Sequence, residues 1–139
     1  MPLVQTLVTS FKKESWQAIH NLETDVLKLA LYTGAATLNA DTTVYTTANE
    51  ASGPGYAAGG VTLTSAVLST DGTTVYLDFS DAVWTGASFT ARGGLIYNSS
   101  KGGRAIAVLD FGSDKTATGT AFTVVMPANT ASTALIRFA

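Results

Sequence analysis

The sequence predicts an all-β protein, an antiparallel β-sandwich or jelly-roll-like fold with seven or eight strands and one short N-terminal helix. Three observations lead to this fold class. Short segments rich in β-branched and aromatic residues recur about every ten residues through the second half of the chain. Gly, Asp and Asn separate these segments, and after residue 25 no helical pattern lies between them. We expect a single domain over residues 1–139.

The N-terminal region predicts an arm followed by a helix. Residues 1–9 mix β-branched and polar side chains, which is typical of an arm or of a short strand that finds a partner. Residues 10–22 have helical spacing, with Thr9 or Ser10 as the cap and Phe11 on the apolar stripe. A helix of this length is marginal alone, so we expect it to lie on the sheet, with Trp16 docking it.

After Asp25 the hydrophobic period changes from helical spacing to two. Leu27, Leu29 and Leu31 then face one way, which predicts a strand with a buried leucine face. Residues 34–60 follow as a long polar loop, and a loop of this length in a compact domain is usually functional or an interaction element. Its sizeable apolar anchors are Leu38, Val44 and Tyr45.

The second half of the chain predicts a series of short strands. Asp71-Gly72 is the signal of a tight hairpin, because Gly accepts the positive φ that such turns require. In the strand after this turn, Val75, Leu77 and Phe79 are expected to face inward. The expected strands span 61–68, 73–79, 87–98, 104–112, 120–126 and 132–138.

The composition narrows the function classes. Apolar residues make up 46% and charged residues 13%, which excludes disorder. With 22 Thr and 21 Ala, much of the surface is neutral and suits packing against other proteins. The net charge of -2 and the scattered basic residues argue against a nucleic-acid partner. We also expect neither a signal peptide nor a membrane-spanning segment, since no apolar run approaches 18 residues.

Catalytic motifs are weak in this chain. The absence of cysteine excludes disulfides, thiolate catalysis and zinc-thiolate sites, and His20 is the only histidine available for a triad. Residues 53–58, GPGYAA, formally match a dinucleotide fingerprint but lack the strand before and the helix after it. Residues 110–112, DFG, lack the other kinase motifs. We therefore expect no cofactor, no metal and no enzyme activity.

Two other groups of residues leave alternatives open. Asp78 with Asp81, and Asp110 with Asp114, lie at expected strand ends, where carboxylates usually form turns but can also bind a cation or cleave glycosides. A sugar-binding face would need several exposed aromatic rings, although Trp84 is expected to fill the core. The candidate rings are Tyr32, Tyr76, Tyr97 and Trp84.

Several segments together resemble a family of small virion proteins of tailed bacteriophages, over nearly the whole chain. The most specific motifs are W-x-x-A-x-F-T-A-R-G at 84–93 and LDFGSDKTA at 109–117. The resemblance also covers FKKESWQAIHNL at 11–22, DVLKLALYTG at 25–34 and the terminal ALIRFA. It implies a non-enzymatic component of the virion, assembled in the bacterial cytoplasm, and it transfers no catalytic residues.

These observations lead to a functional expectation. We expect a capsid decoration or cement protein that binds across junctions of the major capsid protein and forms a dimer or trimer. The alternatives are a receptor- or glycan-binding module of a fibre and, third, a head-tail or tail-tube ring subunit. The arm and the loop residues 40–60 are the expected contact regions. The expected contact residues are Leu3, Val4, Trp16, Tyr45 and Tyr56.

Overall fold

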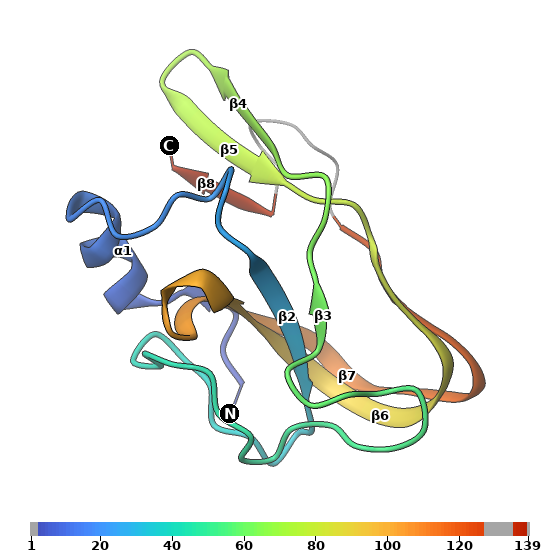
Figure 1. Ribbon diagram of the computed structural model, residues 1–139. Helices are drawn as coiled ribbons and strands as arrows, with labels where there is room; N and C mark the ends of the chain where they lie inside the picture. The colour runs from blue at the N-terminus through green and yellow to red at the C-terminus, as the bar shows by residue number, and fades with distance from the viewer. Residues whose placement is uncertain (1–2, 127–134, 139) are drawn as a thin grey trace.

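The computed structural model describes residues 3–126 and 135–138 and confirms the all-β class (Figure 1). The first two residues of the arm and the start of the last expected strand lie outside the described residues. Within these described residues the chain has eight strands and one short α-helix, as the sequence predicts. In order they are β1 (Thr6–Leu7), α1 (Thr9–Trp16), β2 (Leu27–Tyr32), β3 (Val61–Thr62), β4 (Val67–Asp71), β5 (Thr74–Asp78), β6 (Ala82–Asn98), the 3-10 turn η1 (Ser99–Lys101), β7 (Arg104–Val124) and β8 (Ile136–Phe138).

The strands form two antiparallel sheets of unequal size. A five-stranded sheet has the order β1-β7-β6-β2-β3, and a three-stranded sheet has the order β4-β5-β8. The arrangement is sandwich-like, and one hydrophobic cluster includes residues from both sheets. A jelly roll consists of two Greek keys, and neither sheet has that strand order among its described strands.

The long hairpin of β6 and β7 provides the two longest strands of the larger sheet. The sequence predicts two separate strands at 104–112 and 120–126, and this prediction is wrong because β7 is continuous from Arg104 to Val124. Its pairing with β6 shifts register between Ala91 and Gly93, where residues 111–114 bulge. Gly112 takes a positive φ of 82° within that bulge. The Gly and Asp that resemble a turn in sequence therefore serve a β-bulge.

Both faces of β2 are buried, where the sequence predicts only one buried face. Leu27, Leu29 and Leu31 form the expected buried leucine face. Ala30 and Tyr32 on the opposite face are also fully buried. In Figure 1 the residues after β2, drawn in teal and green, run beside the lower part of the larger sheet. The structure thus adds a second core layer that alternation alone does not indicate.

The backbone of the loop at 33–60 packs against part of β6, where a neighbouring strand would otherwise pair. The N–H of Ser88 donates to the Pro54 carbonyl oxygen at 2.9 Å. A Cβ on Gly53 would collide with the Ser88 carbonyl oxygen, and one on Gly55 would lie 2.9 Å from the Ala87 Cα. The glycines of the GPGYAA motif therefore allow backbone to approach backbone, which explains the motif without a nucleotide.

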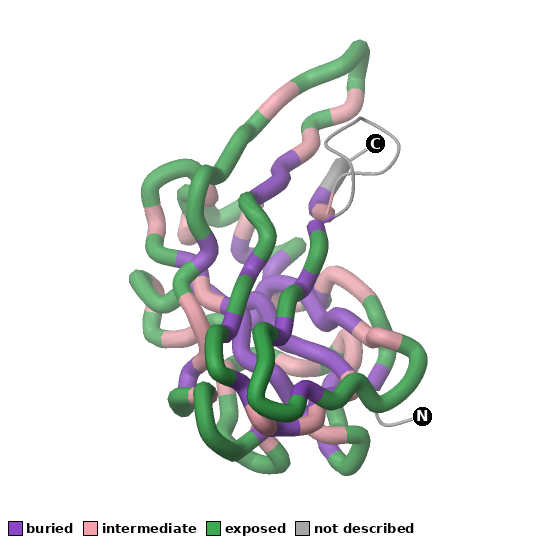
Figure 2. The backbone as a smooth tube through the Cα atoms, turned by 90° about the vertical axis from the view of Figure 1, so that its right-hand side faces the viewer, coloured by how far each residue is buried: buried purple, intermediate pink, exposed green. Residues whose placement is uncertain are grey.

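The β4–β5 hairpin projects from the body of the protein. The turn at Asp71-Gly72 is confirmed, since Asp71 pairs with Thr74 across a two-residue loop. The expected strand 61–68 is split into β3 and β4, because Ser65 between them has a φ of 57° and turns the chain. Figure 2 shows the buried residues gathered in the body and the hairpin tip mostly exposed.

Burial along β5 corrects part of the predicted facing. Leu77 and Phe79 are buried as expected, but Val75 is 41% exposed and Asp78 is buried. Val75 lies toward the tip of the hairpin, where the core no longer reaches it. Alternation predicts the face of a side chain correctly, yet it does not predict how far the core extends.

The arm pairs with its own sheet, and the helix is shorter than predicted. β1 pairs with β7, so the short-strand alternative for residues 1–9 is what the structure shows. The helix ends at Trp16, not at residue 22, because Ala18 takes a φ of 57°. Its N-cap is Val8 with no side-chain hydrogen bond, so the predicted Thr9 or Ser10 cap is wrong. Phe11 docks the helix, whereas Trp16 is exposed.

Alanine substitutions at two glycines with positive φ test how closely the loop backbone packs on β2. Gly60 has a φ of 78°, and a Cβ there would collide with the Leu29 carbonyl oxygen, whereas Gly72 has a φ of 59° and open space around it. We expect Gly60→Ala to lower the free energy of unfolding by at least about 3 kcal/mol and Gly72→Ala by about 1 kcal/mol. Urea denaturation of both variants measures the difference. Equal losses would contradict the close packing of the loop on β2.

Candidate functional site

The Glu50 carboxylate organises the long loop by gathering three hydrogen-bond donors. The Tyr45 hydroxyl donates to Oε1 at 2.7 Å. The Tyr56 hydroxyl and the Gly59 N–H both donate to Oε2, at 2.5 Å and 2.8 Å. Hydrogen bonds to a charged acceptor are stronger than neutral ones, so this carboxylate holds three points of the loop together.

The same group joins the loop to the sheet. The Tyr56 hydroxyl oxygen accepts the N–H of Leu31 in β2 at 3.0 Å. Tyr97 in β6 donates its hydroxyl to the Gly59 carbonyl oxygen at 2.6 Å, and its ring stacks on that of Tyr45 at 4.7 Å. We call Glu50 with Tyr45, Tyr56 and Tyr97 the tyrosine-glutamate cluster.

Burial raises the pKa of the phenols around Glu50. The pKa of Tyr45 and of Tyr56 lies above the ordinary value of 10.0, first because of burial and then because each hydroxyl donates to the Glu50 carboxylate. Burial and the charge of Glu50 raise the pKa of Tyr97 in the same direction. The neutral phenol is therefore the form that the fold requires.

This geometry changes what Tyr45 and Tyr56 can offer a partner. Both side chains are half-buried against the core, and both hydroxyls donate to Glu50. The sequence predicts that Tyr45 and Tyr56 contact a partner, but their side chains hold the loop in place. A partner would meet only the parts of their rings that remain exposed.

A second polar cluster ties helix α1 to the end of the β6–β7 hairpin. Arg104 donates Nη1 to Glu14 Oε2 at 2.7 Å, and His20 Nε2 lies 2.8 Å from Glu14 Oε1. Asn98 donates Nδ2 both to His20 Nδ1 at 2.9 Å and to Asp25 Oδ2 at 2.8 Å. Because the Asn98 amide nitrogen can only donate, His20 carries its proton on Nε2, toward Glu14.

The charges in this clamp favour the ionised carboxylates. Burial alone would raise the pKa of Glu14, but hydrogen bonds from His20 and Arg104, together with the positive charge of Arg104, hold it below its ordinary value of 4.5. Burial likewise opposes the ionisation of Asp25, and the donors Asn21, Asn98 and Lys101 outweigh it. We call Glu14, His20, Asp25, Asn98 and Arg104 together the helix clamp. Their contacts fix the position of α1 on the body of the protein.

His20 serves the helix clamp instead of facing a cleft. Its side chain is 1% exposed and both ring nitrogens are engaged. No set of three His, Cys, Asp or Glu side chains able to hold a metal occurs in the part of the chain that the structure describes. Likewise, no helix among the described residues is long and apolar enough to cross a membrane.

One carboxylate of each pair considered from sequence, Asp81 and Asp110, accepts a backbone hydrogen bond. Asp81 Oδ1 accepts the N–H of Met126 at 2.7 Å, and Asp110 Oδ1 accepts the N–H of Gly112 at 2.9 Å. Asp110 also lies 3.6 Å from Arg92 Nε. The Asp110 contact is local and supports the turn-forming interpretation, whereas the Asp81 contact joins residues 45 positions apart.

The aromatic rings considered for sugar binding do not form an exposed platform. Tyr32, Tyr97 and Trp84 are 0%, 5% and 3% exposed. Trp84 packs edge-on against Phe89 and Phe122, which confirms its expected place in the core. A glycan-binding face would therefore have to use residues other than these three.

The remaining expected contact residues divide between the core and the surface. Leu3 is 2% exposed and bridges to Leu38, so it serves the core and offers a partner no free surface. Val4 is 45% exposed, and Trp16 is 93% exposed. Trp16 stands at the last residue of α1, whose position the helix clamp fixes.

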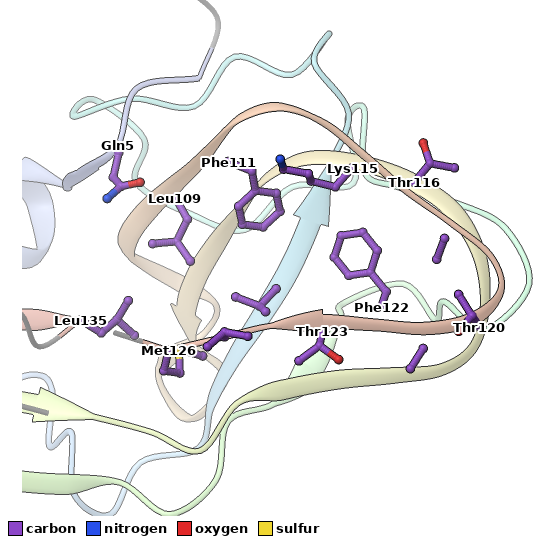
Figure 3. A pocket seen from close by; sticks show the side chains of 14 residues that line it. Gln5, Leu109, Phe111, Lys115, Thr116, Thr120, Phe122, Thr123, Met126 and Leu135 are labelled. Atoms are coloured by element: carbon purple, nitrogen blue, oxygen red, sulfur yellow. The ribbon is translucent and has the colours of Figure 1, made fainter. Parts of the chain in front are cut away.

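An apolar groove of about 540 Å³ lies along β7 (Figure 3). Leu109 and Phe111 lie on one arm of the bent β7 strand and Phe122 on the other arm, and Met126 and Leu135 lie toward one end. Lys115 is the one ionisable side chain among the described residues that line it. The groove can hold apolar side chains, but it lacks the paired polar groups of a catalytic centre.

Comparison of the chain with family models, with curated proteins and with solved structures finds no match. The site is therefore interpreted from its own geometry. Sequence reasoning missed Glu50 and Glu14, because the donors to Glu50 lie in an irregular loop without a periodic pattern and Arg104, which binds Glu14, lies far along the chain. Glu14 and Arg104, for example, are 90 positions apart.

Replacement of the Glu50 carboxylate is expected to loosen the loop. In Glu50→Gln one oxygen becomes an N–H₂ group, so one donor loses its acceptor, and we expect a loss of about 1–3 kcal/mol in the free energy of unfolding. Glu23→Gln is the matched control, because Glu23 is exposed and should change stability by less than about 0.5 kcal/mol. Urea denaturation measures both. Equal stability of the two variants would contradict the role of Glu50.

The raised phenol pKa values predict alkaline destabilisation. The folded state keeps the protons of Tyr45 and Tyr56 more tightly than the unfolded state, so stability is complete below pH 10.0 and falls as pH rises further. We expect the free energy of unfolding to fall between about pH 10 and about pH 12, and to fall less steeply in Tyr56→Phe, which has no phenol to ionise at that position. Denaturation across this range checks the two slopes, and identical slopes would contradict the assignment.

Proposed function

We propose that this protein is a non-enzymatic structural protein of a bacteriophage virion, a capsid decoration protein that binds across junctions of the major capsid protein. The observation that carries the proposal is Trp16, a large aromatic side chain that is 93% exposed. Trp is among the residues that most often supply the binding energy of protein interfaces. The resemblance to small virion proteins supports the same assignment.

The helix clamp makes Trp16 a ready anchor. Glu14 lies in the same turn of α1 and is held by His20, six positions further along the chain, and by Arg104 at the start of β7. The backbone that carries Trp16 is therefore ordered before any partner arrives. An anchor that is already positioned loses less conformational entropy on binding, which favours affinity.

The charge around Trp16 supports a partner of particular chemistry. Lys12 and Lys13 precede Trp16 by four and three positions, so they lie on its side of the helix, and both are exposed. A complementary partner surface would have an apolar pocket with an acidic rim. We propose that the major capsid protein presents such a surface at its junctions.

Binding only to assembled capsid protein would stabilise the shell. A protein that binds the assembled state and not the free subunits shifts the equilibrium toward assembly by mass action. The neutral, Thr-rich and Ala-rich exterior suits this role, because few charges must be desolvated when neighbours cover it.

The test removes the anchor and measures binding to particles assembled without this protein. We expect Trp16→Ala to weaken binding about 30-fold or more, as loss of an interface hot spot does, without changing the folded stability. Gln17→Ala is the control, because Gln17 is exposed beside Trp16. Occupancy is measured by sedimenting particles with the purified variants.

The outcomes separate the candidate functions. Equal occupancy of Trp16→Ala and wild type would contradict the role of the anchor. Failure of the wild-type protein to bind any particle, with binding to immobilised glycans, would replace the proposal by the receptor-binding alternative.

A further inference from the structure

β4 has a free edge in the part of the chain that the structure describes. It pairs only with β5, and it ends the order β4-β5-β8. The outer side of such a strand presents unpaired N–H and C=O groups that can pair with another strand. The edge lies on the projecting hairpin at the top of Figure 1, away from the larger sheet.

The other described edges are protected in ways that β4 is not. β1 and β3 are two residues long, β8 is three, and the loop backbone at Pro54 pairs with β6. The outer part of β7 is interrupted by bulges near Gly112 and Gly119. In contrast, β4 runs for five residues in regular register and contains no Pro, Lys or Arg. Its one charged residue, Asp71, lies beside the turn, so the rest of the strand lacks the charges, prolines and bulges that prevent strand addition.

The edge exposes apolar side chains on both faces. Val67 is 47% exposed and Leu68, on the opposite face, is 44% exposed. Val75 in the neighbouring strand is 41% exposed and lies on the same face as Leu68. Pairing of this edge would bury apolar surface as well as satisfy the backbone.

We propose that a second copy of this chain pairs with β4, in antiparallel orientation about a two-fold axis that passes between the two Ser69 residues. This inference concerns self-association in solution and does not rest on the proposed virion function. A two-fold interface places the same strand on both sides, so the edge must be complementary to itself.

The backbone of the hairpin selects this register. The pair Asp71–Thr74 closes a two-residue loop and is a hydrogen-bonded pair, and such pairs alternate along an antiparallel ladder. Leu68 and Thr70 therefore direct their N–H and C=O groups to the free edge. With Ser69 on the axis, each Leu68 lies opposite the second copy's Thr70, and all of these outward groups are paired.

The side chains agree with the same register. On one face, Leu77 and Leu68 continue into the second copy's Thr70 and Val75, which makes an apolar row across the interface. On the other face, Asp71 lies opposite the second copy's Val67, so no two carboxylates of β4 face each other directly. With the second copy the two-fold axis repeats each pairing, so Leu68 meets Thr70 twice and Val67 meets Asp71 twice.

The test measures oligomeric state with purified protein alone. A five-residue strand pairing is a small interface, so we expect a weak dimer with a Kd on the order of micromolar or higher. Sedimentation equilibrium from about 1 µM to about 1 mM covers this range. A monomer at every concentration would overturn the proposal.

A substitution that places a charge on the β4 edge, compared with a matched substitution elsewhere, tests which strand forms the interface. In Leu68→Lys the two new ammonium groups would lie diagonally across the axis, and we expect the Kd to rise at least about tenfold. Val83→Lys is the control, since Val83 is 46% exposed on β6 and should leave the Kd unchanged. Equal effects of the two substitutions would overturn the assignment to β4. Circular dichroism confirms that both variants are folded.

A cysteine on the axis tests the register directly. The chain has no cysteine, and Ser69 lies opposite its counterpart in a non-hydrogen-bonded pair, where the Cα separation of about 4.5 Å suits a disulfide. We expect Ser69→Cys to form a covalent dimer on mild oxidation at least about tenfold faster than Thr85→Cys, an exposed position on β6. Equal rates would overturn the register, independently of any result with virus particles.

Discussion

The fold depends most on the carboxylate of Glu50 and the donors around it. Most side chains of residues 33–60 are small or polar, so this group adds to the buried side chains of Ala36, Leu38 and Ala51 the polar contacts that hold the loop on the sheet. The hydroxyls of Tyr45 and Tyr56 and the N–H of Gly59 converge on the two carboxylate oxygens. The loop thereby buries the second face of β2, and Tyr32 and Tyr97 become core residues.

The helix clamp uses the same principle beside the tyrosine-glutamate cluster, since Asn98 follows Tyr97 directly in β6. A helix of eight residues does not hold itself together in water, so its position must come from tertiary contacts. Phe11 supplies the apolar contact, while Glu14 binds Arg104 and His20. The burial of charged groups is unfavourable unless they are paired, and here each carboxylate oxygen of Glu14 has a partner. This order in the helix is what leaves Trp16 both exposed and fixed.

The sheet edges differ in how accessible they are to pairing with another strand. Short strands, bulges and the loop backbone protect most of the larger sheet, while the β4–β5 hairpin presents a regular edge with apolar side chains. Trp16 and β4 belong to different elements, and they would serve different contacts. A subunit that joins a copy of itself and a different protein needs two such separate surfaces.

The sequence alone determined the features that depend on neighbouring residues. Alternation over residues 27–31 determined the strand and its leucine face, and Asp71-Gly72 determined a turn, because side-chain direction and turn geometry are local properties. The tertiary structure decided everything that needs distant residues to meet. It joined the two expected strands into β7, since a bulge is visible only against the paired strand. It also brought Glu14 to Arg104 and closed the loop on Glu50, because hydrogen bonds form between groups that the fold places together, whatever their separation in the chain.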